Sequence, residues 1–115
     1  MGGKPRPNTI AIAGCETLLA NALVAARNQG HTIVAGHCRL CGASTSRKTC
    51  CLLCALMLYR DQPTGDGLME SRASKILGVE ERYVLDIVSG FDNDGDVVEN
   101  RDARSLGRKL RRKYL

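Results

Sequence analysis

Four of the six cysteines in this chain form two CxxC pairs, and this feature constrains the fold more than any other. Cys38 and Cys41 make the first pair, and Cys51 and Cys54 make the second pair after nine intervening residues. In a CxxC turn both sulfur atoms face one point, so two pairs complete a tetrahedron of thiolates around Zn²⁺ at about 2.3 Å. We therefore predict that Cys38, Cys41, Cys51 and Cys54 form a structural zinc site.

Two neighbouring residues are alternative ligands, because Cys50 is adjacent to Cys51 and His37 is adjacent to Cys38. Residues 42–49 are long enough for a tight hairpin between the pairs, and an apolar helical run follows. A knuckle, a short β-hairpin and ligands on a helix resemble a small four-cysteine zinc finger of the treble-clef or zinc-ribbon kind. The resemblance implies Zn²⁺ as a structural cofactor, while an iron–sulfur cluster and disulfide or redox chemistry are the alternatives.

The apolar segments are too short to cross a membrane or to direct export. The longest unbroken apolar run covers residues 50–58, whereas a bilayer span needs about 20 residues. Near the N-terminus, the apolar lead-in at residues 10–13 is shorter than the roughly 7–15 residues of a signal peptide. We therefore expect a cytoplasmic protein without a membrane partner, whose cysteines are thiols.

Hydrophobic periodicity predicts a mostly α fold in one small, zinc-stabilised domain. Apolar residues between 12 and 26 recur at helical spacings, which is typical of a helix over residues 16–28 that begins at Thr9 at the earliest. A short strand is expected at residues 31–35, and a leucine-rich helix ends before Pro63. The chain then divides into a flexible arm (1–8), a helix plus the four-cysteine zinc module (9–62), a linker (63–67), and a helical half with a basic C-terminal helix (68–115).

Residues 70–90 predict two short helices about a turn at Gly78. They resemble the helix-turn-helix of phage repressor-type regulators. The resemblance rests on the spacing of Ala73, Ser74, Gly78, Val84 and Ile87. It implies that Val79 is buried with the last two of these residues, and that the second helix ends before Gly90.

By the same resemblance, one face of the second helix would point into a DNA groove. The positions on that face are Glu80, Glu81, Arg82, Leu85 and Asp86. Three acids repel phosphates, so Arg82 is the one candidate for a nucleic-acid contact on this helix. The alternative is a helical hairpin that packs the core or contacts a protein partner.

The excess positive charge lies at the C-terminal end of the chain. Residues 101–115 contain seven Lys and Arg with one Asp, while residues 1–100 contain ten Lys and Arg with eleven Asp and Glu. In the predicted helix over 103–114, an apolar stripe consists of Ala103, Leu106, Leu110 and Tyr114. The other faces carry the candidate phosphate-binding residues, which are Arg104, Arg108, Lys109, Arg111, Arg112 and Lys113. Asn100 or Asp102 is expected to cap the helix N-terminus.

Composition narrows the function classes further. Three Tyr, one Phe and no Trp are too few for the stacking surfaces of single-strand nucleic-acid binders. No nucleophile, base and orienting group converge at a recognisable spacing, so we expect no enzyme. A solvated face and an anionic membrane surface are the alternatives to nucleic acid as explanations of the basic helix.

These features together predict a zinc-binding, DNA-associated regulatory protein of the transcription type, phage-encoded or bacterial. Its basic helix would hold DNA through phosphate contacts that do not depend on sequence. The alternative is a protein-interaction module, such as an inhibitor or adaptor that binds a host protein, in which zinc is purely structural. Dimerisation, which is common among helix-turn-helix regulators, stays open.

Overall fold

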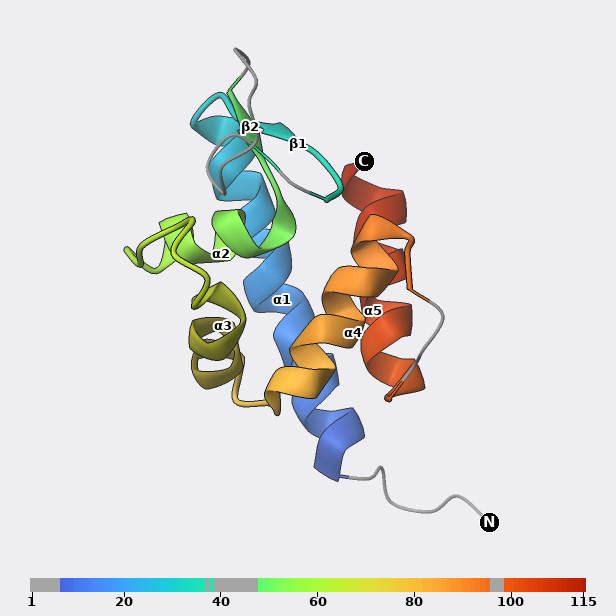
Figure 1. The fold of residues 1–115 in the computed structure, drawn as a ribbon. Helices are drawn as coiled ribbons and strands as arrows, with labels where there is room; N and C mark the ends of the chain where they lie inside the picture. The colour runs from blue at the N-terminus through green and yellow to red at the C-terminus, as the bar shows by residue number, and fades with distance from the viewer. Residues whose placement is uncertain (1–6, 37, 39–47, 96–98) are drawn as a thin grey trace.

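The computed structural model describes residues 7–36, 38, 48–95 and 99–115, with side chains described from residue 11 onward. Within these residues the chain is mostly helical, as predicted, and has one short pair of strands (Figure 1). In chain order the elements are α1 (Pro7–Asn28), β1 (Thr32–Ile33), β2 (Thr49–Cys50), α2 (Leu52–Tyr59), α3 (Met69–Leu77), α4 (Glu81–Asp92) and α5 (Arg101–Tyr114). The long helix α1 contacts α2, α3 and α5, so it is the central element of the fold.

The helix α1 begins at Pro7, so the predicted start at residue 16 is wrong and the earlier alternative at Thr9 is closer. Proline suits the first turn of a helix, because its φ is already helical and the N–H that it lacks would have no helical partner there. Ile12, Leu19 and Leu23 are buried at the spacing of one helix face. The apolar face therefore extends into the N-terminal part of the helix, and the last residues of the predicted arm belong to α1.

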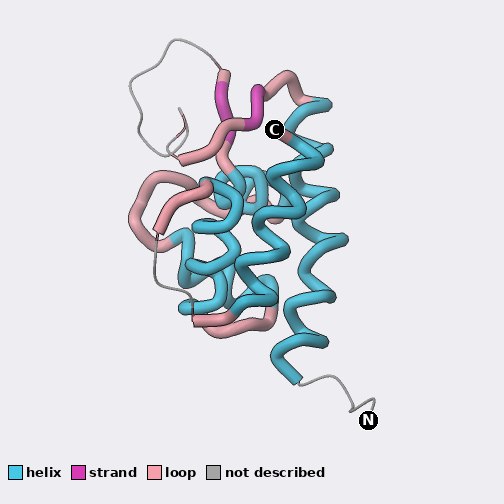
Figure 2. Tube along the Cα trace, turned by 90° about the vertical axis from the view of Figure 1, so that its right-hand side faces the viewer, coloured by secondary structure: helices cyan, strands magenta, loops and turns pink. Residues whose placement is uncertain are grey.

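The strands β1 and β2 pair in parallel, with Thr32 opposite Thr49 and Ile33 opposite Cys50 (Figure 2). This pair is therefore not the β-hairpin that the sequence predicted. A hairpin joins its strands through about two to five residues, whereas residues 34–48 separate these strands and are long enough for the crossover of a parallel pair. The segment predicted to form the hairpin, 42–49, lies almost entirely outside the described residues.

The helix α2 is buried over most of its length and ends before Pro63, as predicted. In the turn that follows, Asp66 accepts a hydrogen bond from the Leu68 backbone N–H at 3.1 Å and forms an ion pair with Arg72 of α3. The Arg72 guanidinium also donates to the Pro63 carbonyl oxygen at 3.2 Å. These contacts hold residues 63–67, the predicted linker, against the start of α3.

The helices α3 and α4 meet at residues 78–80, where Gly78 has a left-handed φ of +70°. Val79, Val84 and Ile87 are buried, as the pattern of apolar residues implied. Two other expectations from the repressor resemblance are wrong. Gly90 lies inside α4 instead of following it, and Asp86 is buried instead of facing outward.

Contacts with α5 explain both differences. A Cβ atom at Gly90 would lie 2.2 Å from the Arg104 carbonyl oxygen, and one at Gly107 would lie 2.0 Å from the Ile87 carbonyl oxygen. The two helix backbones therefore touch where two glycines meet, and α4 and α5 form the most extensive contact between elements (Figure 1). The buried Asp86 carboxylate accepts a hydrogen bond from the Asn100 backbone N–H at 2.6 Å, at the point where α5 begins.

Candidate functional site

Three of the four predicted zinc ligands lie together in the interior. The sulfur atoms of Cys38, Cys51 and Cys54 are all within 4.8 Å of one another, and all three residues are buried. In a tetrahedral zinc site with bonds of about 2.3 Å, the sulfur atoms are about 3.8 Å apart. The cluster therefore has nearly the spacing of a metal centre, and a small contraction would complete three of its bonds.

Local structure explains how the second CxxC pair delivers its sulfur atoms. Cys51 is the N-cap residue of α2, with extended backbone, and Cys54 lies in the first helical turn. Three residues of helix bring the two side chains to the same side, because side chains at i and i+3 are neighbours on a helix surface. Cys38 reaches them from the segment that follows β1.

The remaining candidate ligands differ from these three. Cys50 is completely buried, but it is not a member of the cluster, and its thiol donates to the Cys51 carbonyl oxygen at 3.5 Å. Among the described residues, Cys51 is therefore the ligand candidate and Cys50 is not. Cys41 and His37 lie outside the described residues.

The cluster is rich in sulfur and buried. The pKa of the Cys54 thiol is raised, first by its hydrogen bond with Cys51, then by burial and by the nearby charges of Cys51 and Cys38. The thioether of Met69 lies 3.7 Å from the Cys54 sulfur atom. Several thiolates at this distance repel one another unless a cation neutralises them, and sulfur ligands select Zn²⁺, Cu⁺ or iron–sulfur clusters over Mg²⁺ and Ca²⁺.

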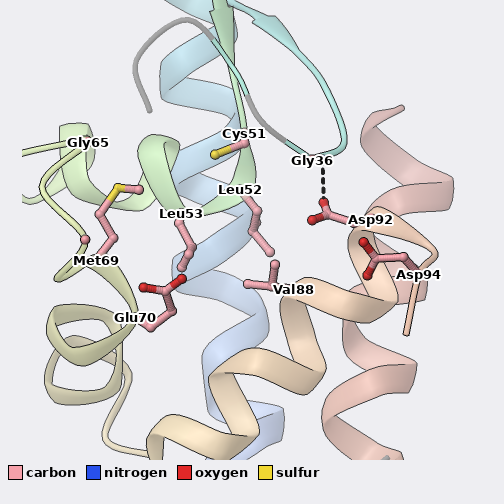
Figure 3. A pocket seen from close by; sticks show the side chains of 11 residues that line it. Gly36, Cys51, Leu52, Leu53, Gly65, Met69, Glu70, Val88, Asp92 and Asp94 are labelled. Atoms are coloured by element: carbon pink, nitrogen blue, oxygen red, sulfur yellow. Dashed lines mark hydrogen bonds between the residues drawn. The ribbon is translucent and has the colours of Figure 1, made fainter. Parts of the chain in front are cut away.

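A cleft of about 330 Å³ lies beside the cysteine cluster, and Figure 3 shows the side chains that line it. Cys51 is at one edge, Leu52, Leu53 and Val88 form an apolar part, and Asp92 lies across from them. The Gly36 backbone N–H donates to the Asp92 carboxylate at 2.8 Å. This bond ties the segment that leads to Cys38 to the C-terminal end of α4.

The structure divides the predicted phosphate-binding residues into two groups. The side chains of the first group are half-buried or make intramolecular contacts. Arg111 is half-buried and donates to the Phe91 carbonyl oxygen at 2.8 Å, and Lys109 forms an ion pair with Glu16 of α1 at 2.8 Å. Arg104 is half-buried, and its Nη1 atom is fully buried with no hydrogen-bond partner among the described residues.

Arg82 also belongs to this group, since it pairs with Glu80 at 3.2 Å and its guanidinium lies 5.0 Å from the centre of the Tyr83 ring. On the same face Glu81 and Leu85 are exposed. The outward face of α4 therefore has few cations available for a phosphate.

The second group consists of exposed side chains on α5. Ala103, Leu106 and Leu110 are buried, as the predicted stripe requires, and Gly107 is buried with them. The opposite face carries the outward ridge, which we define as Arg101, Ser105, Arg108 and Arg112; all four side chains are exposed. Lys113 is exposed beside this ridge, with its ammonium 5.6 Å from the centre of the Tyr114 ring.

Sequence reasoning missed Arg101, because it placed the start of the helix at residue 103. The Asn100 side chain accepts a hydrogen bond from the Ala103 backbone N–H at 3.0 Å, so Asn100 is the N-cap and α5 begins at Arg101. Asn100 was one of the two expected caps. Choosing it over Asp102 would have added Arg101 to the basic face.

No helix among the described residues has the length and apolar character needed to cross a membrane. No protein-family model, curated protein or solved structure matches the chain, so its resemblance to zinc fingers and to repressor-type regulators depends on its own motifs alone.

Proposed function

We propose that this protein is a non-enzymatic, zinc-binding regulator that associates with DNA through the outward ridge of α5. The observation that carries the proposal is the division of that helix into two faces. One face is buried against α4 and α1, while Arg101, Arg108 and Arg112 point outward and take part in none of the ion pairs among the described residues. A row of arginines on one helix face suits phosphates, because each guanidinium can donate two hydrogen bonds to one phosphate.

The salt dependence of binding tests this proposal. Three to five phosphate contacts give a slope of log K against log[salt] of about −3 to −4.5 on duplex DNA. Replacing Arg108 and Arg112 by glutamine should reduce the steepness of that slope by about 2 and should weaken binding on every DNA sequence equally. The control is Arg60→Gln, which removes one positive charge from an exposed position at the end of α2 and should leave the slope unchanged. Absence of DNA binding at low salt, or equal binding by both variants, would contradict the proposal.

The metal in this proposal is Zn²⁺, held by Cys38, Cys51 and Cys54, with Cys41 as the fourth ligand. The CxxC spacing supports Cys41, and the geometry of the other three supports a shared metal. Zinc with four thiolates has no open position, so its role here is to fix the fold and not to activate water.

Native mass spectrometry with and without a chelator tests the metal and its ligands. We expect one zinc ion per chain, and we expect Cys41→Ser to weaken its retention against the chelator while Cys50→Ser does not. Cys15→Ala is a matched control, because Cys15 is also a buried thiol but lies in α1 and outside the cluster. A chain that stays folded and metal-free after expression in zinc-supplemented medium would refute the site.

A second candidate function is that of an adaptor or inhibitor that binds a basic protein. The exposed face of α4 supports it, because Leu85 is 49% exposed and lies near Glu80 and Glu81. Capture from a host lysate with and without nuclease separates the two functions. A partner that persists after nuclease treatment and is lost in Leu85→Ser favours the adaptor, whereas a partner lost with nuclease favours DNA.

A further inference from the structure

A second cleft lies at the C-terminal end of α5, on the side of the molecule where the chain terminus approaches β1 (Figures 1 and 2). Its volume is about 460 Å³. Two segments that are distant in sequence line it: residues 27–33, from the end of α1 through β1, and Tyr114 with Leu115. The fold therefore creates a site here that no sequence motif indicates.

Positive charge surrounds this cleft. Arg27 lines it from the last turn of α1 and is exposed. The Lys48 ammonium donates to the Gln29 carbonyl oxygen at 2.7 Å, which holds it next to Gly30 in the lining. Lys113 lies over the ring of Tyr114, another lining residue. The lining includes no Asp or Glu side chain.

His31 supplies an unsatisfied polar atom in the same lining. Its Nδ1 atom is fully buried and has no hydrogen-bond partner among the described residues. Burial and the charge of Lys48 lower the pKa of this histidine, while a hydrogen bond with the Thr49 backbone opposes that effect. An anion in the cleft would balance the nearby cations of Arg27 and Lys48.

We propose that this cleft binds a phosphate group, which Arg27 contacts directly and Lys48 holds by its charge. Arginine recognises phosphate through paired hydrogen bonds. The cleft is at the end of the helix that carries the outward ridge, so this proposal rests on the proposed function when the phosphate belongs to DNA. A free phosphate ion has the same chemistry, and the experiment distinguishes the two sources.

The first measurement uses the zinc-loaded full chain and inorganic phosphate, followed by NMR of backbone amides and the histidine ring. We expect saturable shifts at Gly30, His31 and Thr32 that chloride at equal ionic strength does not produce. Arg27→Gln should weaken phosphate affinity at least tenfold, while Arg108→Gln leaves it unchanged. Equal shifts with chloride, or unchanged affinity in Arg27→Gln, would overturn the proposal. Lys48→Gln is the second variant if Arg27→Gln does not fold.

The second measurement repeats the variants with duplex DNA. If DNA supplies the phosphate, Arg27→Gln reduces the steepness of the salt slope by about 1, as the loss of one contact requires. Unchanged DNA binding together with lost phosphate binding would support the cleft as a site for free phosphate and would exclude the DNA source. Phosphate binding in a protein that binds no DNA would support the cleft and would refute the proposed function.

Discussion

Replacing Gly107 by alanine tests whether the crossing of α4 and α5 depends on glycine. An alanine Cβ at this position would lie 2.0 Å from the Ile87 carbonyl oxygen and 2.8 Å from the Phe91 backbone nitrogen. Both atoms belong to the backbone of α4, so no side-chain rotation relieves the contact. The helices must separate by about 1 Å or more, in an interior that is otherwise close-packed.

The expected loss of stability follows from two opposing contributions. Adding a methyl group to a tight contact costs about 1–3 kcal/mol, and a backbone neighbour favours the upper end of that range. Alanine is the better helix former and recovers about 1 kcal/mol. The free energy of unfolding should therefore fall by about 2 kcal/mol, which corresponds to a decrease in Tm of about 8 °C for a domain of this size.

Urea and thermal unfolding of the zinc-loaded protein measure this change, and Gly14→Ala is the matched control. Gly14 is also inside a helix, but a Cβ atom there has no heavy atom within 4 Å. The same substitution should therefore stabilise the protein by up to about 1 kcal/mol. Unchanged or increased stability of Gly107→Ala would refute the close crossing. Adding Gly90→Ala should cost less than the sum of the single changes, because both act on one contact.

Three further predictions concern the cap, the turn and the metal. Asn100→Ala removes the acceptor for the Ala103 N–H and should lower the free energy of unfolding in urea by about 1 kcal/mol, while Asn100→Asp retains most of it. The Arg72 guanidinium, with the Leu68 N–H, lowers the pKa of Asp66 to about 2. The contribution of Asp66 to the free energy of unfolding is therefore present above the ordinary carboxyl pKa of 3.8 and is lost as the pH falls from 3.8 towards 2. Asp66→Asn should flatten the dependence of the free energy of unfolding on pH in that window. A chelator should accelerate hydrogen exchange at Thr32, Val34 and Cys54 more than at Ile87 and Leu110. Cys54 belongs to the cysteine cluster, and the N–H groups of Thr32 and Val34 bond to the segment that leads to Cys51. Uniform acceleration would contradict a local role for the metal.

Much of the helical architecture followed from the sequence, because apolar periodicity directly reports which face of a helix is buried. The boundaries near Pro63 and Gly78 were predicted for the same local reasons. The sequence pattern places the start of α1 too late, because proline is typical of flexible arms and yet is well suited to a first helical turn. The parallel pairing of β1 and β2 was not predictable from local pattern, since the two strands are separated in sequence by residues 34–48.

The functional sites were predictable to different extents. CxxC spacing is local, so it identified Cys51 and Cys54 correctly as members of a cluster, and Cys38 joins them in space. The roles of Asp86 and Gly90 depend on contact with α5, which is distant along the chain, so the repressor resemblance assigned both incorrectly. The cleft at His31 combines two segments that are distant along the chain and has no signal in the sequence.

The burial of charged side chains changes what the basic composition of the C-terminal helix implies for binding. All seven cations between residues 101 and 115 count equally in the net charge, but Arg111 bonds to the end of α4 and Lys109 bonds to α1. With Arg104 half-buried, four exposed cations remain free of ion pairs among the described residues: Arg101, Arg108, Arg112 and Lys113. Four phosphate contacts give a salt slope of about −3.6, whereas seven would give about −6.3. The measured slope therefore reports whether Arg104, Lys109 and Arg111 keep their places against α4 and α1 when DNA binds, because a slope near the larger value requires all three to turn towards phosphates.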